Sequence, residues 1–191
     1  MKNIIAYFFI PACFFISMAA SAQYTNKVNA FVQSGYTVPY ASGANMSQYY
    51  HGGFATEMHI VASLSKRKSD ARFSFLFNTG YNYFGGRTWE DYDSYGNLVL
   101  YKSDPIMVLP VHAGLRLDIG NVPKMKNALY MSQDWGYTFI EGPKGGTRFG
   151  HTFNLGFLAR RFDMVWGINT WKGSTGNKFH YFSFRMGYMI F

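Results

Sequence analysis

The sequence predicts an all-β fold: an eight-stranded antiparallel up-and-down transmembrane β-barrel, preceded by a cleavable signal peptide. Three observations lead to this prediction. Apolar and polar residues alternate along most of the chain, and this period of two residues is typical of a strand with one apolar face. The alternating segments are long enough to cross a bilayer, which takes about 9–11 tilted residues. The linkers between them alternate between long and short, as in barrels with short turns on one side of a membrane.

The first residues, 1–22, have the layout of a secretory signal peptide. A lysine precedes an apolar run, and a small-residue cleavage site ends at Ala22. The run is shorter than the roughly 20 apolar residues of a membrane-spanning helix, and it contains a proline. A lipidated cysteine at Cys13 is the weaker interpretation, because the apolar run continues past that residue. We therefore expect one domain, the barrel at 23–191, without cysteine.

The first four strands are expected at residues 27–37, 54–65, 72–83 and 106–119. The third is the clearest, because Phe73, Phe75 and Phe77 alternate with small or polar residues without a break. The second and fourth show the same alternation with aliphatic residues such as Ile60 and Leu115. The first strand has the weakest pattern.

The last four strands are expected at residues 127–139, 149–159, 162–171 and 179–191. A two-residue hairpin turn at Arg160 and Arg161 would keep Ala159 and Phe162 on the same face, so the phase of the alternation is preserved. Arginine suits the positive φ of such a turn poorly. This boundary is therefore predicted from the phase and not from the turn chemistry.

The polar faces of these strands indicate which side faces lipid. A soluble lipocalin-like barrel would have the same period, but a dense mixture of charges on its exterior. The polar faces here carry only Lys27, Glu57, Arg72, Arg116, Asp118, Asp134 and Arg185. Small residues and a few charges suit the narrow interior of an eight-stranded barrel. We expect the aromatic residues to face lipid, and the lumen to be filled by side chains that include arginine–carboxylate pairs.

Composition excludes several other classes of protein. Aromatic residues make up 20% and charged residues 15% of the chain, which excludes an acidic or polar disordered protein. A single cysteine excludes a disulfide scaffold and a thiolate zinc site. The net charge of +8 concentrates in the short turns, for example at Lys66, Arg67 and Lys68. We also assign Asp163 to a short turn. Since no aromatic stacking platform accompanies this basic turn, we expect contact with anionic headgroups and no nucleic-acid partner.

The signal ending at Ala22, the Leu109–Pro110 strand core and the aromatic closing strand from His180 to Phe191 resemble the small outer-membrane β-barrel proteins of Gram-negative bacteria. The resemblance implies a location in the cell outer membrane, among outer-membrane lipids and lipopolysaccharide. It also implies that the barrel assembly machinery recognises the closing strand. Phe191 fits that signal by position, although it falls off the lipid-facing series of the strand.

Two motifs invite a chemical interpretation, and each departs from its pattern. Residues 149–154 resemble the His-x-Ser-Asn motif of the lipid A deacylase barrels, with His151 in place but Phe153 at the serine position. Without a hydroxyl nucleophile we assign no catalytic residue and expect no enzyme. Residues 91–96 resemble the start of a calcium loop, but Tyr95 and Lys102 occupy two ligand positions. We favour a turn in an acidic external loop, and assign no metal ligand and no cofactor.

A third group of residues is expected to form one network in the lumen: Glu57, His59, His112, Arg116, Asp134 and Arg185. Interior hydrogen bonding is favoured over metal binding or pH sensing. The sequence thus predicts a structural or surface-interaction role, carried by external loops at 38–53 and 84–105, which could contact an extracellular ligand or protein. A narrow transport barrel for small or hydrophobic solutes is the alternative, and a lipid A-modifying enzyme is less favoured.

Overall fold

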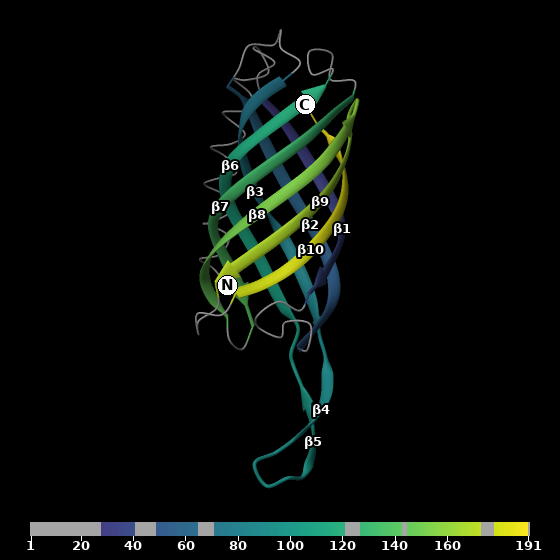
Figure 1. Ribbon diagram of the computed structural model, residues 1–191, viewed down its shortest axis with the longest axis vertical. Coiled ribbons are helices and arrows are strands. Elements are labelled where there is room, and N and C mark those ends of the chain that lie inside the picture. Colours follow the sequence, from purple (N-terminus) through teal and green to yellow (C-terminus); the bar gives the residue numbers. More distant parts are fainter. Residues whose placement is uncertain are drawn as a thin grey trace, which may run out of the picture.

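The computed structural model describes residues 28–40, 49–64, 71–120, 127–142, 145–172 and 178–190. Eight antiparallel strands form a closed barrel in the order β1-β10-β9-β8-β7-β6-β3-β2 (Figure 1). Their bounds are β1 (Val28–Pro39), β2 (Tyr50–Ser63), β3 (Ala71–Gly86), β6 (Ile106–Gly120), β7 (Asn127–Glu141), β8 (Gly146–Ala159), β9 (Phe162–Lys172) and β10 (Lys178–Met189). The pairing of β1 with β10 closes the barrel, so no strand edge is left open in it. The predicted eight-stranded antiparallel barrel is confirmed.

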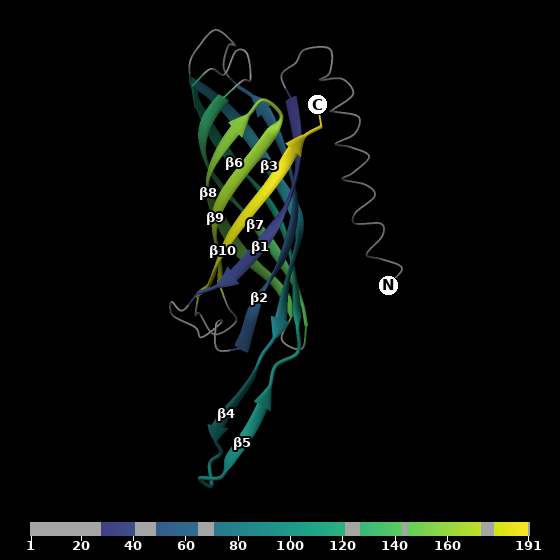
Figure 2. The ribbon, with the colours of Figure 1, turned by 90° about the vertical axis from the view of Figure 1, so that its right-hand side faces the viewer.

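Two further strands, β4 (Thr88–Tyr92) and β5 (Leu98–Lys102), form a separate two-stranded sheet. This hairpin extends well beyond one end of the barrel (Figures 1 and 2). The prediction of a loop at 84–105 was therefore wrong, because β3 continues to Gly86 and most of the remainder is strand. We call this end of the barrel the hairpin end, and the opposite end the turn end.

The other predicted boundaries need smaller corrections. The expected external loop at 38–53 is shorter, since β1 reaches Pro39 and β2 begins at Tyr50. Its centre, 41–48, lies outside the described residues, as do the predicted signal peptide and Lys66, Arg67 and Lys68 of the basic turn. The two-residue turn is confirmed, because Ala159 pairs with Phe162. Arg160 takes a φ of 56° there, a left-handed conformation that costs a non-glycine residue roughly 1–2 kcal/mol.

The exterior of the barrel is apolar, as the sparse charges on the polar strand faces predict. Phe75 and Leu115 are 43% and 50% exposed, whereas their inward neighbours Ser74 and Arg116 are buried. The same arrangement holds on all eight barrel strands. A surface of this kind is unfavourable in water and matches the hydrocarbon of a bilayer. Among the described residues there is no helix long and apolar enough to span a membrane.

The lumen contains an apolar cluster at each end, which the sequence did not predict. The base plug, at the turn end, consists of Phe31, Val61, Leu76, Ala128 and Leu158. The rim plug, at the hairpin end, consists of Phe84, Ile106, Val108, Trp171 and Tyr181. We expected only small and polar groups inside. Large apolar side chains occupy the two ends because the interior of a closed eight-stranded barrel is packed, and apolar groups leave no hydrogen bond unmade.

Candidate functional site

Between the two plugs lies a layer of buried polar side chains. Strand alternation points Glu57 of β2, Asp134 of β7 and Arg185 of β10 into the lumen, where all three are buried. A charge held away from water must be paired and hydrogen-bonded, or it destabilises the fold strongly. The partners of these charges therefore define what the lumen can do.

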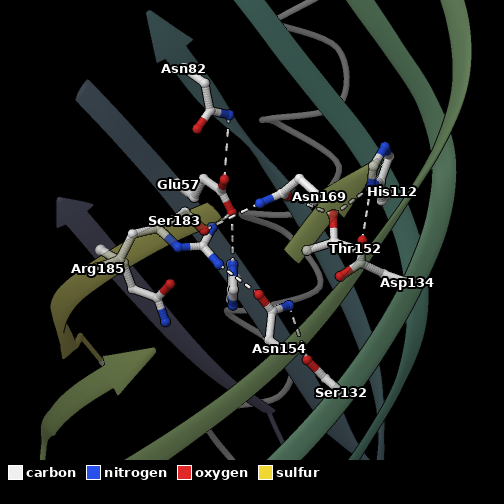
Figure 3. A network of polar contacts seen from close by, with 12 residues as sticks. Glu57, Asn82, His112, Ser132, Asp134, Thr152, Asn154, Asn169, Ser183 and Arg185 are labelled. Carbon is white, nitrogen blue, oxygen red and sulfur yellow. Dashed lines mark hydrogen bonds and ion pairs between the residues drawn. The ribbon is translucent and has the colours of Figure 1, made fainter. Parts of the chain in front are cut away.

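The first group is built around Glu57. The Arg185 guanidinium forms an ion pair with the Glu57 carboxylate, and His59 Nε2 lies 3.2 Å from Glu57 Oε2. Asn82 Nδ2 donates to Glu57 Oε1 at 3.4 Å. On its other side, Arg185 Nη2 donates to Asn154 Oδ1 at 2.8 Å (Figure 3). These contacts join β2, β3, β8 and β10 across the lumen.

The second group is built around His112. Its Nδ1 lies 2.8 Å from Asp134 Oδ1, and its Nε2 lies 3.0 Å from Thr138 Oγ1. Thr152 Oγ1 donates to Asn169 Oδ1 at 2.9 Å and lies 3.4 Å from His112 Nδ1 (Figure 3). Both ring nitrogens of His112 therefore have partners, which favours a structural role for this imidazole.

The third group lies closer to the base plug. Asp118 pairs with Arg116 at 2.7 Å and with Arg72 at 3.3 Å. The Arg116 guanidinium also stacks on the Tyr130 ring, 3.5 Å from its centroid. This cation–π contact, away from water, adds to the ion pair and holds Arg116 against the barrel wall.

Asp163 corrects a sequence prediction, since it lies in the lumen and not in a turn. It is fully buried, and it accepts hydrogen bonds from the Tyr130 hydroxyl at 2.8 Å and from Gln33 Nε2 at 2.6 Å. The Tyr130 ring packs where a Cβ on Gly156 would lie, so glycine makes room for it. The signal was present in the sequence, because an outward Phe162 requires the next residue to point inward.

The six residues predicted to form one network are all buried in the lumen. The structure brings Glu57, His59 and Arg185 together, and His112 with Asp134, but Arg116 pairs with Asp118 in the third group. In the described part of the chain the buried arginines and carboxylates are Arg72, Arg116, Arg185, Glu57, Asp118, Asp134 and Asp163. Lys27, also predicted to face inward, lies outside this part.

Outside the barrel, the β4–β5 hairpin is fixed at its base. Trp89 stacks on Tyr101 with ring centroids 5.7 Å apart, and the Tyr49 ring meets Trp89 edge-on at 4.9 Å. The Arg87 N–H donates to the Tyr49 carbonyl oxygen at 3.0 Å, and the Ser103 N–H donates to the Arg87 carbonyl oxygen at 2.9 Å. Tyr49, which precedes β2, therefore links the hairpin to the barrel rim through one aromatic contact and one backbone hydrogen bond.

The calcium-like segment, 91–96, closes this hairpin. Asp93 Oδ1 accepts N–H groups from Tyr95 and Asn97, each at 2.9 Å, and Gly96 has a φ of 80° that completes the turn. Hydrogen bonds, the largest from the Asn97 backbone, lower the pKa of the Asp93 carboxyl. Asp91 Oδ1 accepts the Tyr92 N–H at 2.9 Å. The described residues hold no group of three His, Cys, Asp or Glu side chains able to bind a metal ion.

The deacylase-like segment lies on the outer face of β8. His151 is half-buried there, and in the strand register it lies opposite Trp135 of β7 and Thr170 of β9. Phe153, at the position of the motif's serine, is an exposed residue of the same face. The segment therefore brings an imidazole and a phenyl ring, and not an imidazole and a hydroxyl, to the two positions of the motif.

No protein-family model and no curated protein matches the sequence. Among solved structures, the outer membrane enzyme PagL superposes with a TM-score of 0.52 at 8% identity, over 84% of this chain and 98% of that one. Ail, the attachment invasion locus protein of Yersinia pestis, in complex with the heparin analogue sucrose octasulfate, superposes with a TM-score of 0.48 at 12% identity, over 86% of this chain and 99% of that one. Neisserial surface protein A gives 0.43 at 13% identity, over 84% and 95%.

The likeness to PagL shows a shared fold, that of a small outer-membrane β-barrel. The closed barrel and its apolar exterior agree with this fold. The protein is thus an integral β-barrel protein of the outer membrane, as the sequence predicted.

Proposed function

We propose that the protein is a closed outer-membrane scaffold that presents the β4–β5 hairpin for contacts outside the membrane. The role is structural or interactive, without transport and without catalysis. The barrel supplies a rigid base, and the hairpin supplies the surface that a partner can reach. Loops and hairpins on a rigid scaffold are where recognition residues concentrate.

The observation that carries this proposal is the presence of an apolar plug at each end of the lumen. Every member of the two plugs is at most 6% exposed. Between them, the Glu57–Arg185 pair links β2 to β10 across the interior. A solute would have to displace packed side chains at both ends and separate buried charges between them, which costs several kcal/mol.

Planar-bilayer recording tests the closed lumen. We expect the purified protein to give no stable openings, whereas a variant with Phe84→Gly and Trp171→Gly in the rim plug and Phe31→Gly and Leu158→Gly in the base plug should leak. The leaking variant shows that insertion occurs and that the assay detects a path. Stable openings of the unaltered protein that change with Arg185→Gln would favour the alternative, a narrow transport barrel.

The absence of catalysis is supported by Phe153, which leaves His151 without a hydroxyl at the motif position. Mass spectrometry of lipid A from cells with and without the protein tests it. We expect identical acylation. Loss of an acyl chain that depends on His151 would overturn this part of the proposal.

We also propose that the barrel assembly machinery recognises β10. Its outward residues Phe182, Phe184 and Tyr188 form an aromatic series on the lipid-facing side, which supports the proposal. The terminal Phe191 lies outside the described residues. Outer-membrane lipids and lipopolysaccharide are the expected surroundings of this face.

A further inference from the structure

Among the described residues, no strand pairs with the outer edge of β4. Within the described residues, β4 pairs with β5 alone. The Asp93 N–H donates to the Asn97 carbonyl oxygen, and the Ser103 N–H donates to the Arg87 carbonyl oxygen. These two bonds show which opposite residues of β4 and β5 are hydrogen-bonded to each other. Along two antiparallel strands, hydrogen-bonded residue pairs alternate with pairs that are not hydrogen-bonded. Thr88 and Glu90 belong to the second kind, so their N–H and C=O groups point away from β5.

The open edge ends at Tyr92, whose N–H already bonds Asp91 Oδ1. The edge is therefore centred on Glu90. A segment of this length can accept a short added strand, which is a recurrent mode of peptide recognition.

The chemistry of this edge is acidic on both faces. Glu90 and Asp91 are consecutive, so their exposed carboxylates project to opposite sides of the hairpin. Neither forms an ion pair with another described residue. Trp89 and Tyr92 flank them. The edge of β5, by contrast, carries mainly apolar residues and Lys102.

The face of the hairpin that carries Glu90 also exposes large apolar side chains. Tyr92, Leu98 and Leu100 are 69%, 60% and 67% exposed and lie on adjacent positions of the two strands. A two-stranded hairpin is marginally stable in water on its own, and a third strand or a covering surface stabilises it. The hairpin extends beyond the end of the barrel (Figure 2), and these three side chains are exposed.

We propose that the outer edge of β4 binds an extended segment of a partner protein as a third strand. Two adjacent basic residues of that segment pair with Glu90 and Asp91, one on each face. Apolar residues before and after the basic pair contact Trp89 and Tyr92. This inference rests on the proposed contact role and specifies the chemistry of the partner: apolar, basic, basic, apolar.

Fluorescence anisotropy with the full-length protein in nanodiscs and a labelled Ser-Val-Lys-Arg-Val-Ser peptide tests the inference. A Ser-Val-Glu-Asp-Val-Ser peptide controls for charge, and the first peptide with methylated backbone nitrogens at its lysine and arginine controls for strand formation at the same charge. We expect the first peptide to bind and the two controls to bind at least about tenfold more weakly, since they lose the ion pairs or the backbone hydrogen bonds.

Matched variants of the hairpin distinguish the contribution of the β4 backbone edge from that of the Glu90 charge. Glu90→Gln should weaken binding roughly twofold to fivefold, as expected for an exposed ion pair, and Glu90→Pro at least about tenfold, because it also removes the edge N–H. Leu100→Pro, at the directly opposite position on β5, should leave binding within about twofold. Glu141→Gln, an exposed carboxylate at the end of β7, controls for net charge.

Three results would overturn the inference: equal loss with Leu100→Pro and Glu90→Pro, equal binding of the acidic or the N-methylated peptide, or hairpin-dependent self-association in place of peptide binding. Heat-modifiable migration in gels verifies that each variant keeps its barrel, since the hairpin lies outside it. The bilayer recordings are independent of these results. If the protein stays closed in the bilayer recordings, but Glu90→Pro and Leu100→Pro weaken peptide binding equally, the proposed function stands and this inference fails.

Discussion

At the scale of single residues, the sequence predicted which charges are buried but not how they pair. Glu57 and Arg185 were both expected in the lumen, and their phase within each strand was sufficient for that. Their direct contact depends on the closure of β10 against β1, which no local pattern contains. Asp163 was misassigned because it stands next to a turn, although the phase of β9 points it inward.

Replacing Arg185 by Gln should destabilise the barrel by about 3–5 kcal/mol, because it leaves the Glu57 carboxylate buried without its cation. The measurement is the free energy of unfolding in urea, followed by tryptophan fluorescence in detergent. The double variant with Glu57→Gln is the control and should recover part of the loss. An unfolding midpoint of Arg185→Gln equal to that of the unaltered protein would contradict the assigned pair.

At the scale of strands, the eight barrel strands were predictable because each separates a lipid-facing side from a lumen-facing side. β4 and β5 were missed because both of their faces meet water, so no alternation marks them, and acidic residues are uncommon in strands. The plugs were missed for a different reason. Leu76 and Phe84 occupy inward positions of β3 that the alternation alone assigns to polar groups.

A carboxylate on the outer face of β3 should impair insertion. We expect Phe75→Asp to reduce the yield of folded, heat-modifiable protein in lipid vesicles, because a charge facing hydrocarbon costs about 1–3 kcal/mol. Tyr92→Asp makes the same kind of change on the hairpin, outside the bilayer, and should leave the yield unchanged. Equal yields of the two variants would argue against the facing of β3.

The hairpin turn should loosen in acid. The pKa of Asp93 is lowered from its ordinary value of 3.8 by the N–H groups of the turn. The Asp93 carboxylate therefore contributes its full stabilisation of the turn above pH 3.8. This stabilisation is lost as the pH falls through the lower pKa that Asp93 has in the folded protein. We expect hydrogen-exchange protection of the Asn97 amide to persist from neutral pH to below 3.8 and then to decline. Protection that disappears above this value, or that is unchanged in Asp93→Ala, would contradict the role of this carboxylate.

At the scale of the whole molecule, one physical condition explains both the fold and the proposed role. The closed sheet turns its apolar side chains outward and seals its interior with two plugs and three polar groups. The sequence predicted the direction of the side chains, because charges are too sparse on the polar faces for a water-exposed surface. It could not predict the sealing, which depends on side chains from distant strands meeting on the barrel axis.

Quenching of single-tryptophan proteins by brominated lipids tests this arrangement most directly. Trp166 is 51% exposed on the outer face of β9, whereas Trp171 of the same strand is 3% exposed in the rim plug. With the other tryptophans replaced by phenylalanine, we predict strong quenching of Trp166 and little quenching of Trp171 by lipids brominated along their acyl chains. Strong quenching of Trp171 and protection of Trp166 would show that the apolar side chains face inward, and would contradict the account.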